Sequence, residues 1–187
     1  MLNYNSPINN HIEYNDISVK EVSPIMKLNL RGKKREFFTT AGKHLDMILP
    51  TEANTSSSSS KLTSIWLSPD EWMVVSNEET QKDTNNYDLE ESLYNSISKT
   101  SLGSVVDVTD QFVMLELEGS KVYELFSSGS PFNFNEFKKK KGSTTQTLLN
   151  NIDVIIRNKD KDLVNIFVRR SFAQHLFSWI NDACKNF

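Results

Sequence analysis

The chain has 187 residues, enough for one hydrophobic core or two closely packed half-domains, with 24 acidic and 21 basic side chains and a formal net charge of -3. This balance argues against a protein that binds nucleic acid or anionic lipid mainly through its charge. The single cysteine, Cys184, excludes an internal disulfide, and together with three scattered histidines it gives no metal-site spacing. We therefore expect a protein of the reducing cytoplasm.

The chain lacks the features of a membrane or secreted protein. No run approaches the roughly 20 apolar residues that span a bilayer. Residues Met1–Asp16 are rich in asparagine and contain no apolar segment typical of a signal peptide. We expect residues 1–24 to form an N-terminal extension that neither targets nor anchors the protein.

The first patterned segment predicts a strand followed by a helix. Polar and apolar residues alternate over Ile25–Arg31, as a half-buried strand requires, and Gly32 ends the strand. Helical spacing predicts a helix over Glu36–Leu49, which Pro50 terminates. The inward residues are expected to be Met26, Leu28 and Leu30 in the strand, and Phe38, Ala41, Leu45 and Ile48 in the helix.

A loop and a hairpin follow. Thr51–Lys61 contains five consecutive serines and predicts a flexible loop. Ser64–Leu67 and Trp72–Ser76 are expected to pair as a β-hairpin across the type I turn signal Ser68–Glu71. Asn77–Tyr87 is predicted to be a further polar loop.

The middle of the chain repeats the helix and strand signals. Leu89, Leu93 and Ile97 recur every four residues and predict a helix over Asp88–Lys99, and Gly103 separates this helix from a strand at Ser104–Val108. A clean alternation then predicts a strand ending at Gly119, with Ser120 as the N-cap of a short helix to Phe126. The inward residues of this strand are expected to be Val113, Leu115 and Leu117.

The C-terminal part predicts three strands and a closing helix. The strands are expected at Thr144–Leu149, Asp153–Arg157 and Val164–Arg169, and Ser171 is expected to cap the helix. The apolar stripe of this helix consists of Phe172, Leu176, Phe177, Ile180 and Ala183.

The order of elements suggests an internal duplication. Leu28–Gly32 and Leu115–Gly119 lie 87 residues apart, and each is followed by a helix, a loop and a hairpin-like pair of strands. The fold class predicted is α+β, with duplicated strand, helix and hairpin halves packed as one domain. We expect that single domain to cover 25–187, as two pseudo-repeats at 25–103 and 104–187.

Few residues suggest chemistry. Asp107 and Asp110 are spaced as paired carboxylates for acid-base catalysis, but turn and cap roles are the preferred interpretation because no nucleophile accompanies them. His175 has no second ligand at helical spacing, and the glycines lack phosphate-binding patterns. No catalytic, cofactor-binding or metal residue is therefore predicted.

Candidate interface residues are easier to name. Arg169 and Arg170 form a cationic corner before a helix N-terminus, suited to an ion pair or, as the less favoured interpretation, to an anionic ligand. Trp66, Trp72 and Trp179 are of a type enriched both at binding hot spots and in cores. The basic run 138–141 is interpreted as a solvated loop. We predict Arg169, Arg170 and Trp72 as interface residues.

Five blocks of sequence together resemble the gamma subunit family of heterotetrameric sarcosine oxidase. They occur in the family's order and lie between Leu28 and Trp179. The blocks are Ile65–Trp72, Val105–Asp110, Gly129–Phe132, Gln146–Thr147 and Val168–Ala173. The sequence departs from the family at Ser130 and near Thr144, where the family often has cysteines, so thiol chemistry is not expected there.

The resemblance implies a place in a cytoplasmic bacterial complex of alpha, beta, gamma and delta subunits. Such a complex oxidises sarcosine with oxygen to glycine and hydrogen peroxide and passes the one-carbon unit to tetrahydrofolate. The resemblance further implies that FAD, FMN, NAD and tetrahydrofolate are held by other subunits and that this chain holds no cofactor. Its fold is expected to resemble a shortened folate-binding aminomethyltransferase.

The expected function is therefore noncatalytic: the chain binds the alpha subunit and supports assembly of an oxidoreductase, without catalytic residues of its own. Three alternatives remain open. The first is a free-standing folate-binding protein, and the second is a subunit of a related dimethylglycine-type oxidase. The third is a nucleic-acid or RNA-modification accessory domain, against which the net charge argues.

Overall fold

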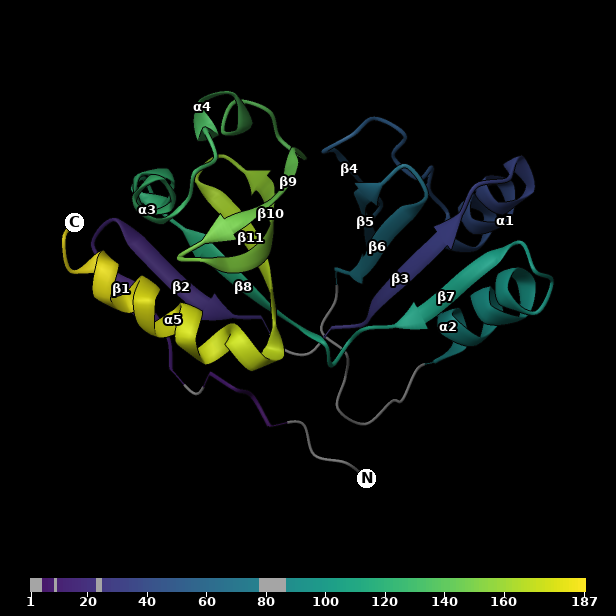
Figure 1. Ribbon diagram of the computed structural model, residues 1–187, viewed down its shortest axis with the longest axis horizontal. Helices are drawn as coiled ribbons and strands as arrows, with labels where there is room; N and C mark the ends of the chain where they lie inside the picture. Colours follow the sequence, from purple (N-terminus) through teal and green to yellow (C-terminus); the bar gives the residue numbers. More distant parts are fainter. Residues whose placement is uncertain (1–4, 9, 23–24, 78–86) are drawn as a thin grey trace. The chain divides into compact units, whose positions relative to one another are not determined.

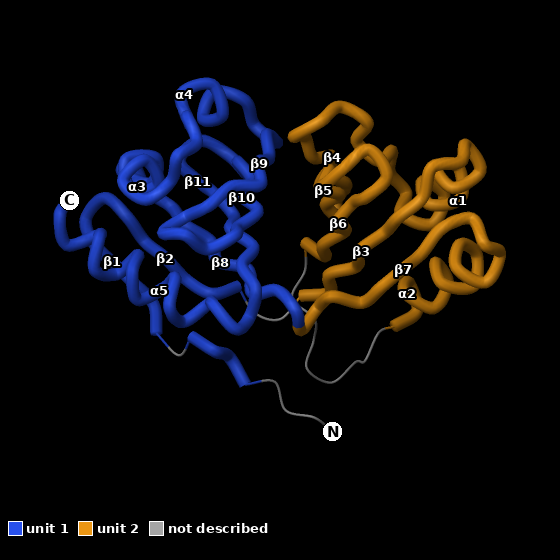
Figure 2. The backbone as a smooth tube through the Cα atoms, in the orientation of Figure 1, with its two compact units in different colours: residues 1–22, 111–187 blue, residues 23–110 orange. Residues whose placement is uncertain are grey.

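The computed structural model describes residues 5–8, 10–22, 25–77 and 87–187. The chain forms two compact units, coloured separately in Figure 2. Unit 1 contains residues 1–22 and 111–187, and unit 2 contains residues 23–110. Each unit has one sheet whose described strand pairs are all antiparallel, together with its own helices. The α+β prediction is confirmed.

Unit 2 is built on a five-stranded sheet with the order β4-β5-β6-β3-β7 (Figure 1). Its strands are β3 (Lys27–Gly32), β4 (Ser56–Ser58), β5 (Leu62–Ser68), β6 (Glu71–Ser76) and β7 (Gly103–Asp107). Its helices are α1 (Arg35–Leu45) and α2 (Asp88–Leu93), and the π-helix η1 (Tyr94–Ser98) continues α2. The predicted hairpin is confirmed as β5 and β6, while residues 78–86 of the predicted polar loop lie outside the described residues.

The core of unit 2 lies between one face of this sheet and its helices. The buried residues include Leu28 and Leu30 of β3, Trp72 and Val74 of β6, Phe37, Ala41 and Leu45 of α1, and Leu93 and Ile97 of α2 and η1. Gly32 and Gly103 face each other across β3 and β7, and the Phe37 ring lies over both of them. A Cβ on Gly32 would come within 2.3 Å of the Phe37 ring, so this close packing requires glycine.

Three predictions for unit 2 are corrected by the structure. Helix α1 ends at Leu45 because Asp46 adopts the left-handed conformation, with φ 51°, so Ile48 is 84% exposed instead of continuing the inward stripe. Phe37 is the fully buried phenylalanine, and Phe38 is only partly buried. Lys27, expected on the outer face of its strand, is buried and donates from Nζ to the carbonyl oxygens of Ile25 and Thr109.

The serine-rich segment is more ordered than predicted. Ser56–Ser58 forms β4 and pairs with β5 at the edge of the sheet. The hydroxyl of Ser57 donates to the carbonyl oxygen of Ile48 at 2.7 Å, and the hydroxyls of Ser58 and Thr63 lie 3.0 Å apart. Hydrogen bonds between β4 and β5, together with those of the serine side chains, therefore hold Ser56–Ser58 in place, although the serine-rich composition predicts a flexible loop.

Unit 1 is built on a six-stranded sheet with the order β1-β2-β8-β11-β10-β9 (Figure 1). Its strands are β1 (Ile12–Tyr14), β2 (Ile17–Glu21), β8 (Phe112–Glu118), β9 (Thr144–Leu149), β10 (Ile152–Asp160) and β11 (Leu163–Arg169). Its helices are α3 (Val122–Gly129), α4 (Phe134–Phe137) and α5 (Arg170–Cys184). Residues expected as an extension, 1–24, supply β1 and β2, while β7, expected in the second pseudo-repeat, pairs with β3 in unit 2.

The core of unit 1 lies on the sheet face that carries α3 and α5. It includes Leu115 and Leu117 of β8, Ile166 of β11, Leu125 of α3 and Leu176 and Ile180 of α5. The predicted helix caps are wrong, because Ser120 precedes α3 and donates to Asp16 at 3.1 Å, while Ser171 lies inside α5. Phe172 is exposed, and Ala173 takes the buried position in the first turn of α5.

Candidate partner-binding surfaces

Asp107, the first of the two paired aspartates, has a structural role. Oδ1 of Asp107 accepts a hydrogen bond from the Thr109 amide at 2.8 Å, and Thr109 Oγ1 accepts one from the Lys27 amide at 3.0 Å. No hydrogen bond joins Asp107 to Asp110 in the described part of the chain. The turn interpretation of Asp107 is confirmed, because its carboxylate serves the corner that follows β7.

The other side chains considered for catalysis or metal binding form no common site among the described residues. His175 is exposed on α5, whereas Cys184 is buried at its end, and burial raises the pKa of the Cys184 thiol to about 11. The described residues include no group of three or more His, Cys, Asp or Glu side chains that would hold a metal ion. None of the described helices has the length and apolar character needed to cross a membrane.

The basic run 138–141 is solvated, as interpreted from the sequence. Lys139 pairs with Glu136 at 2.6 Å and Lys141 with Asp160 at 2.5 Å, all with largely exposed side chains. The hydrogen bond from Lys141 lowers the pKa of Asp160. Two of the four lysines are therefore neutralised locally by exposed ion pairs, which contribute little to stability.

A polar cluster around Glu116 was not predicted from the sequence. This carboxylate of β8 accepts from Lys20 of β2 at 3.1 Å, from Lys159 of β10 at 2.7 Å and from Asn165 of β11 at 3.3 Å. Burial acts to raise the pKa of Glu116, but the hydrogen bonds and charges of Lys159 and Lys20 outweigh it and lower the pKa. The only sequence signal for this cluster was the outward position of Glu116 in the alternating strand. The cluster connects strands of one sheet.

The arginine corner lies where β11 joins α5. Arg169 pairs with Phe112 of β8 in the sheet register, and its side chain is exposed without a hydrogen bond or ion pair to another described residue. Arg170 is half-buried, its amide donates to the Gln111 carbonyl at 2.9 Å, and its guanidinium donates to the Asn5 carbonyl. Phe172 follows and is 49% exposed. Of the two arginines, Arg169 is therefore the more exposed.

Trp72 is a core residue. It is 1% exposed, its ring lies 5.7 Å from the Phe37 ring and 5.2 Å from the Phe38 ring, and its Nε1 donates to the Pro50 carbonyl at 2.8 Å. Its side chain has no surface left for a partner, so the structure assigns Trp72 to the core instead of the predicted interface.

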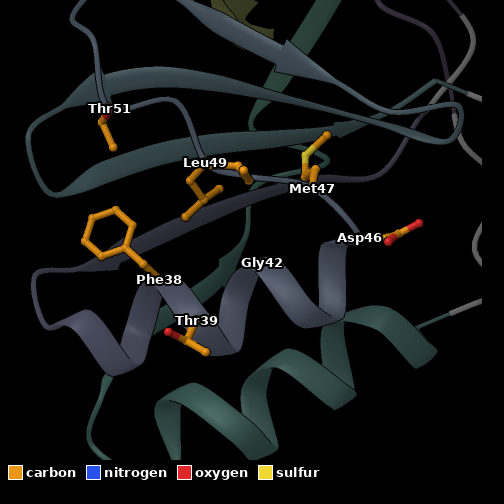
Figure 3. A pocket seen from close by; sticks show the side chains of 8 residues that line it. Phe38, Thr39, Gly42, Asp46, Met47, Leu49 and Thr51 are labelled. Atoms are coloured by element: carbon orange, nitrogen blue, oxygen red, sulfur yellow. The ribbon is translucent and has the colours of Figure 1, made fainter.

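A groove of about 620 Å³ lies beside α1, near this aromatic cluster. Figure 3 shows Phe38 and Leu49 pointing into the space between α1 and the chain above it, with Asp46 at the far end of the helix. The lining residues are Phe38, Thr39, Gly42, Asp46, Met47, Ile48, Leu49 and Thr51. Apolar side chains thus dominate an open surface of unit 2.

The segment that follows α1 is held in place at three points. The Met47 amide donates to the Gly42 carbonyl at 3.2 Å, Ser57 donates to the Ile48 carbonyl at 2.7 Å, and Trp72 donates to the Pro50 carbonyl at 2.8 Å. Ile48 therefore remains exposed on an anchored backbone. With 84% of its surface accessible, it is the most exposed large apolar side chain among the described residues.

The fold is also found in solved structures. A chain of the heterotetrameric sarcosine oxidase from Corynebacterium sp. U-96, in complex with pyrrole 2-carboxylate, matches with a TM-score of 0.81 and 22% identity over 91% of this chain and 85% of that chain. The glycine cleavage system aminomethyltransferase T from Bartonella henselae matches with a TM-score of 0.60 and 15% identity. That match covers 88% of this chain and 45% of the other. The expected likeness to the aminomethyltransferase fold is confirmed.

Sequence comparison identifies the family. No curated protein matches this chain. The family model described as "Sarcosine oxidase, gamma subunit family" matches residues 33–186, which include most of both units. The chain therefore belongs to the sarcosine oxidase gamma subunit family.

Proposed function

We propose that this chain is the noncatalytic gamma subunit of a tetrahydrofolate-dependent sarcosine oxidase complex and that it acts in assembly. The observation that carries the proposal is the family match over residues 33–186. The exposed Arg169 and Phe172 and the groove around Ile48 support an assembly role, because they are ordered cationic and apolar surfaces suited to a protein partner.

The partner proposed is the alpha subunit, with beta and delta subunits in the same cytoplasmic complex. In this proposal the larger subunits hold FAD, FMN, NAD and tetrahydrofolate, oxidise sarcosine to glycine with formation of hydrogen peroxide, and produce methylene-tetrahydrofolate. This chain contributes buried surface that keeps the alpha subunit in its assembled form.

The test is co-expression of the tagged chain with the products of neighbouring genes, followed by affinity capture and native mass spectrometry. We expect a one-to-one complex with a large flavoprotein chain, and that complex should oxidise sarcosine. A clean monomer that binds tetrahydrofolate by itself would contradict the proposal and favour a free-standing folate-binding protein. A complex that prefers dimethylglycine would retain the assembly role and change the substrate.

A further inference from the structure

We propose that the groove beside α1 docks a segment of another subunit that inserts an apolar side chain next to Ile48 and presents acidic side chains to Arg35 and Lys43. This inference rests on the proposed function and adds to it the contact surface and the chemistry of the occupant. The groove is lined by Phe38, Met47 and other residues of one continuous stretch, 38–51, all within unit 2.

The apolar part of the argument concerns Ile48. An isoleucine that is 84% exposed loses the benefit of burial in the free chain. Here it adjoins a concave surface formed by the partly buried Phe38 and Met47 over the buried Leu49, so a partner side chain would contact apolar atoms of Phe38, Met47 and Ile48. Apolar anchors that enter well-packed pockets supply most of the binding energy at protein interfaces.

The order of the segment strengthens the argument. Hydrogen bonds at Met47, Ile48 and Pro50 fix the backbone on both sides of the exposed side chain. A partner therefore does not pay the entropy of ordering a loop when it binds. An exposed apolar residue on a preorganised backbone is suited to recognition.

The charge around the groove indicates the character of the partner. Arg35 and Lys43 lie four residues before and after Thr39 on α1, so they share the helix face of a lining residue. Both are exposed, and neither side chain has an ion pair within the described part of the chain. The whole chain has a net charge of -3, yet the stretch 33–43 contains Lys34, Arg35 and Lys43, in addition to Lys33, which pairs with Asp70 at 3.5 Å, against one acid, Glu36.

This arrangement also gives the groove a direction. Arg35 is the first residue of α1, whereas Lys43 lies in its last turn, three residues before Asp46. Acidic residues of the partner are favoured beside Arg35, and at the other end of α1 the charge of Asp46 offsets part of the attraction of Lys43. The occupant is therefore a segment with acidic residues on one side of its apolar anchor, presented by another subunit.

The first test compares complexes formed by the full chain and its Ile48 variants after co-expression with its partner. Ile48→Glu should weaken association roughly 30-fold, because it removes an anchor and places a negative charge near the partner's acids. Ile48→Lys should weaken it less, since the lysine stem retains apolar contact and its charge is attracted. Leu148→Glu, which changes an exposed apolar residue of β9 in unit 1, is the matched control and should bind like the wild type.

The second test concerns the basic side chains on α1 beside the groove. Lys43→Glu should weaken association and reduce its dependence on salt, while Lys138→Glu, an equal charge change on an exposed lysine of unit 1, should not. Each isolated variant should keep the melting temperature of the wild type, because Ile48 and Lys43 are exposed.

The outcomes separate the two proposals. If the wild-type chain forms the complex and Ile48→Glu binds equally well, the groove is not the docking site and the proposed function stands. If the wild-type chain forms no complex with another subunit, both proposals fail. If Ile48→Glu instead dissociates a homodimer of the wild-type chain, the occupant is a second copy, and the groove proposal is overturned.

Discussion

At the scale of single residues, Trp72 contributes to stability through both ends of its side chain. Its ring stacks on Phe37, and its Nε1 satisfies the Pro50 carbonyl at 2.8 Å. We expect Trp72→Phe to lower the free energy of unfolding by about 1–3 kcal/mol through the lost hydrogen bond, and Trp72→Ala by about 3–5 kcal/mol through the cavity. Urea unfolding measures both changes. If both variants lost less than about 0.5 kcal/mol of unfolding free energy, the assignment of Trp72 to the core would be contradicted.

Charge reversal at Arg169 tests another of the three predicted interface positions. Arg169→Glu should reduce recovery of the complex while leaving the melting temperature of the isolated chain unchanged, because the side chain is exposed and unpaired among the described residues. Lys138→Glu provides the same charge change away from the corner. A lower melting temperature for Arg169→Glu alone would show that Arg169 is structural and would remove the arginine corner from the candidate surfaces.

Cys184 gives a residue-scale probe of packing in unit 1. Burial raises its thiol pKa to about 11, so both access and thiolate formation are suppressed in the folded chain. We expect no labelling by a maleimide at neutral pH before urea is added, and one label per chain afterwards. In the control Ser171→Cys, an exposed position of α5, the native chain should accept one label. Rapid native labelling of wild type would contradict the buried position.

The residue predictions from sequence succeeded where residue type and local pattern agree. Val113, Leu115 and Leu117 alternate with polar neighbours, and all three lie in the core. Trp72 belongs to the continuous apolar run 72–75, in which alternation cannot tell one face from the other. Tryptophan is also common both in cores and at interfaces, so its type did not decide between them.

At the scale of elements, the Glu116 cluster links four strands of the unit 1 sheet, β2, β8, β10 and β11. Because the pKa of Glu116 is lowered in the folded chain, its stabilising effect is present above the unfolded pKa of about 4.3 and is lost as the pH falls through the lower folded value. We therefore expect acidification from pH 7 to below about 4 to cost less stability in Glu116→Gln than in wild type.

Urea unfolding of unit 1 across this pH range makes the comparison. Glu118→Gln changes an exposed carboxylate at the end of the same strand and serves as the control. Identical acid sensitivity in wild type and Glu116→Gln would show that the cluster does not contribute to the pH dependence.

Helix boundaries show where element prediction failed. Ile48 continues the helical spacing of Ala41 and Leu45, so periodicity extended the helix to Leu49. The structure ends α1 at Leu45, because Asp46 turns the chain into the left-handed region and Ile48 then follows a different backbone path. The groove was missed for this reason. Aspartate tolerates the left-handed conformation, which was the only local signal of an earlier end.

At the scale of the whole molecule, the chain starts in unit 1, forms all of unit 2 and then returns to complete unit 1 (Figure 2). The repeated pattern of strand, glycine and helix predicted two similar halves. Each copy of the pattern lies in one contiguous stretch of sequence, so it can be recognised without the structure. β1 pairs with its neighbour β2, and β2 pairs with the distant β8, a long-range contact that no local pattern reveals. The N-terminal residues were therefore interpreted as an extension.

Truncation of residues 1–22 tests this chain path. Removing them takes Ile8, Ile12, Ile17 and Val19, each at most 5% exposed, from the core of unit 1. It also makes β8 an edge strand, paired only with β11. We expect the truncated chain to lose hydrogen-exchange protection throughout β8 and to aggregate or unfold at lower urea concentration, whereas exchange in β3 of unit 2 should change less.

Point variants in the full chain show whether the truncation acts through its buried apolar side chains or through the shortening of the chain. Val19→Asp should cost about 3 kcal/mol or more, because it places a charge among buried apolar side chains. Glu13→Ala, at an exposed position of β1, should stay within about 0.5 kcal/mol of wild type. If the truncated chain instead keeps native exchange in β8, residues 1–22 are dispensable, and the description as an extension is correct.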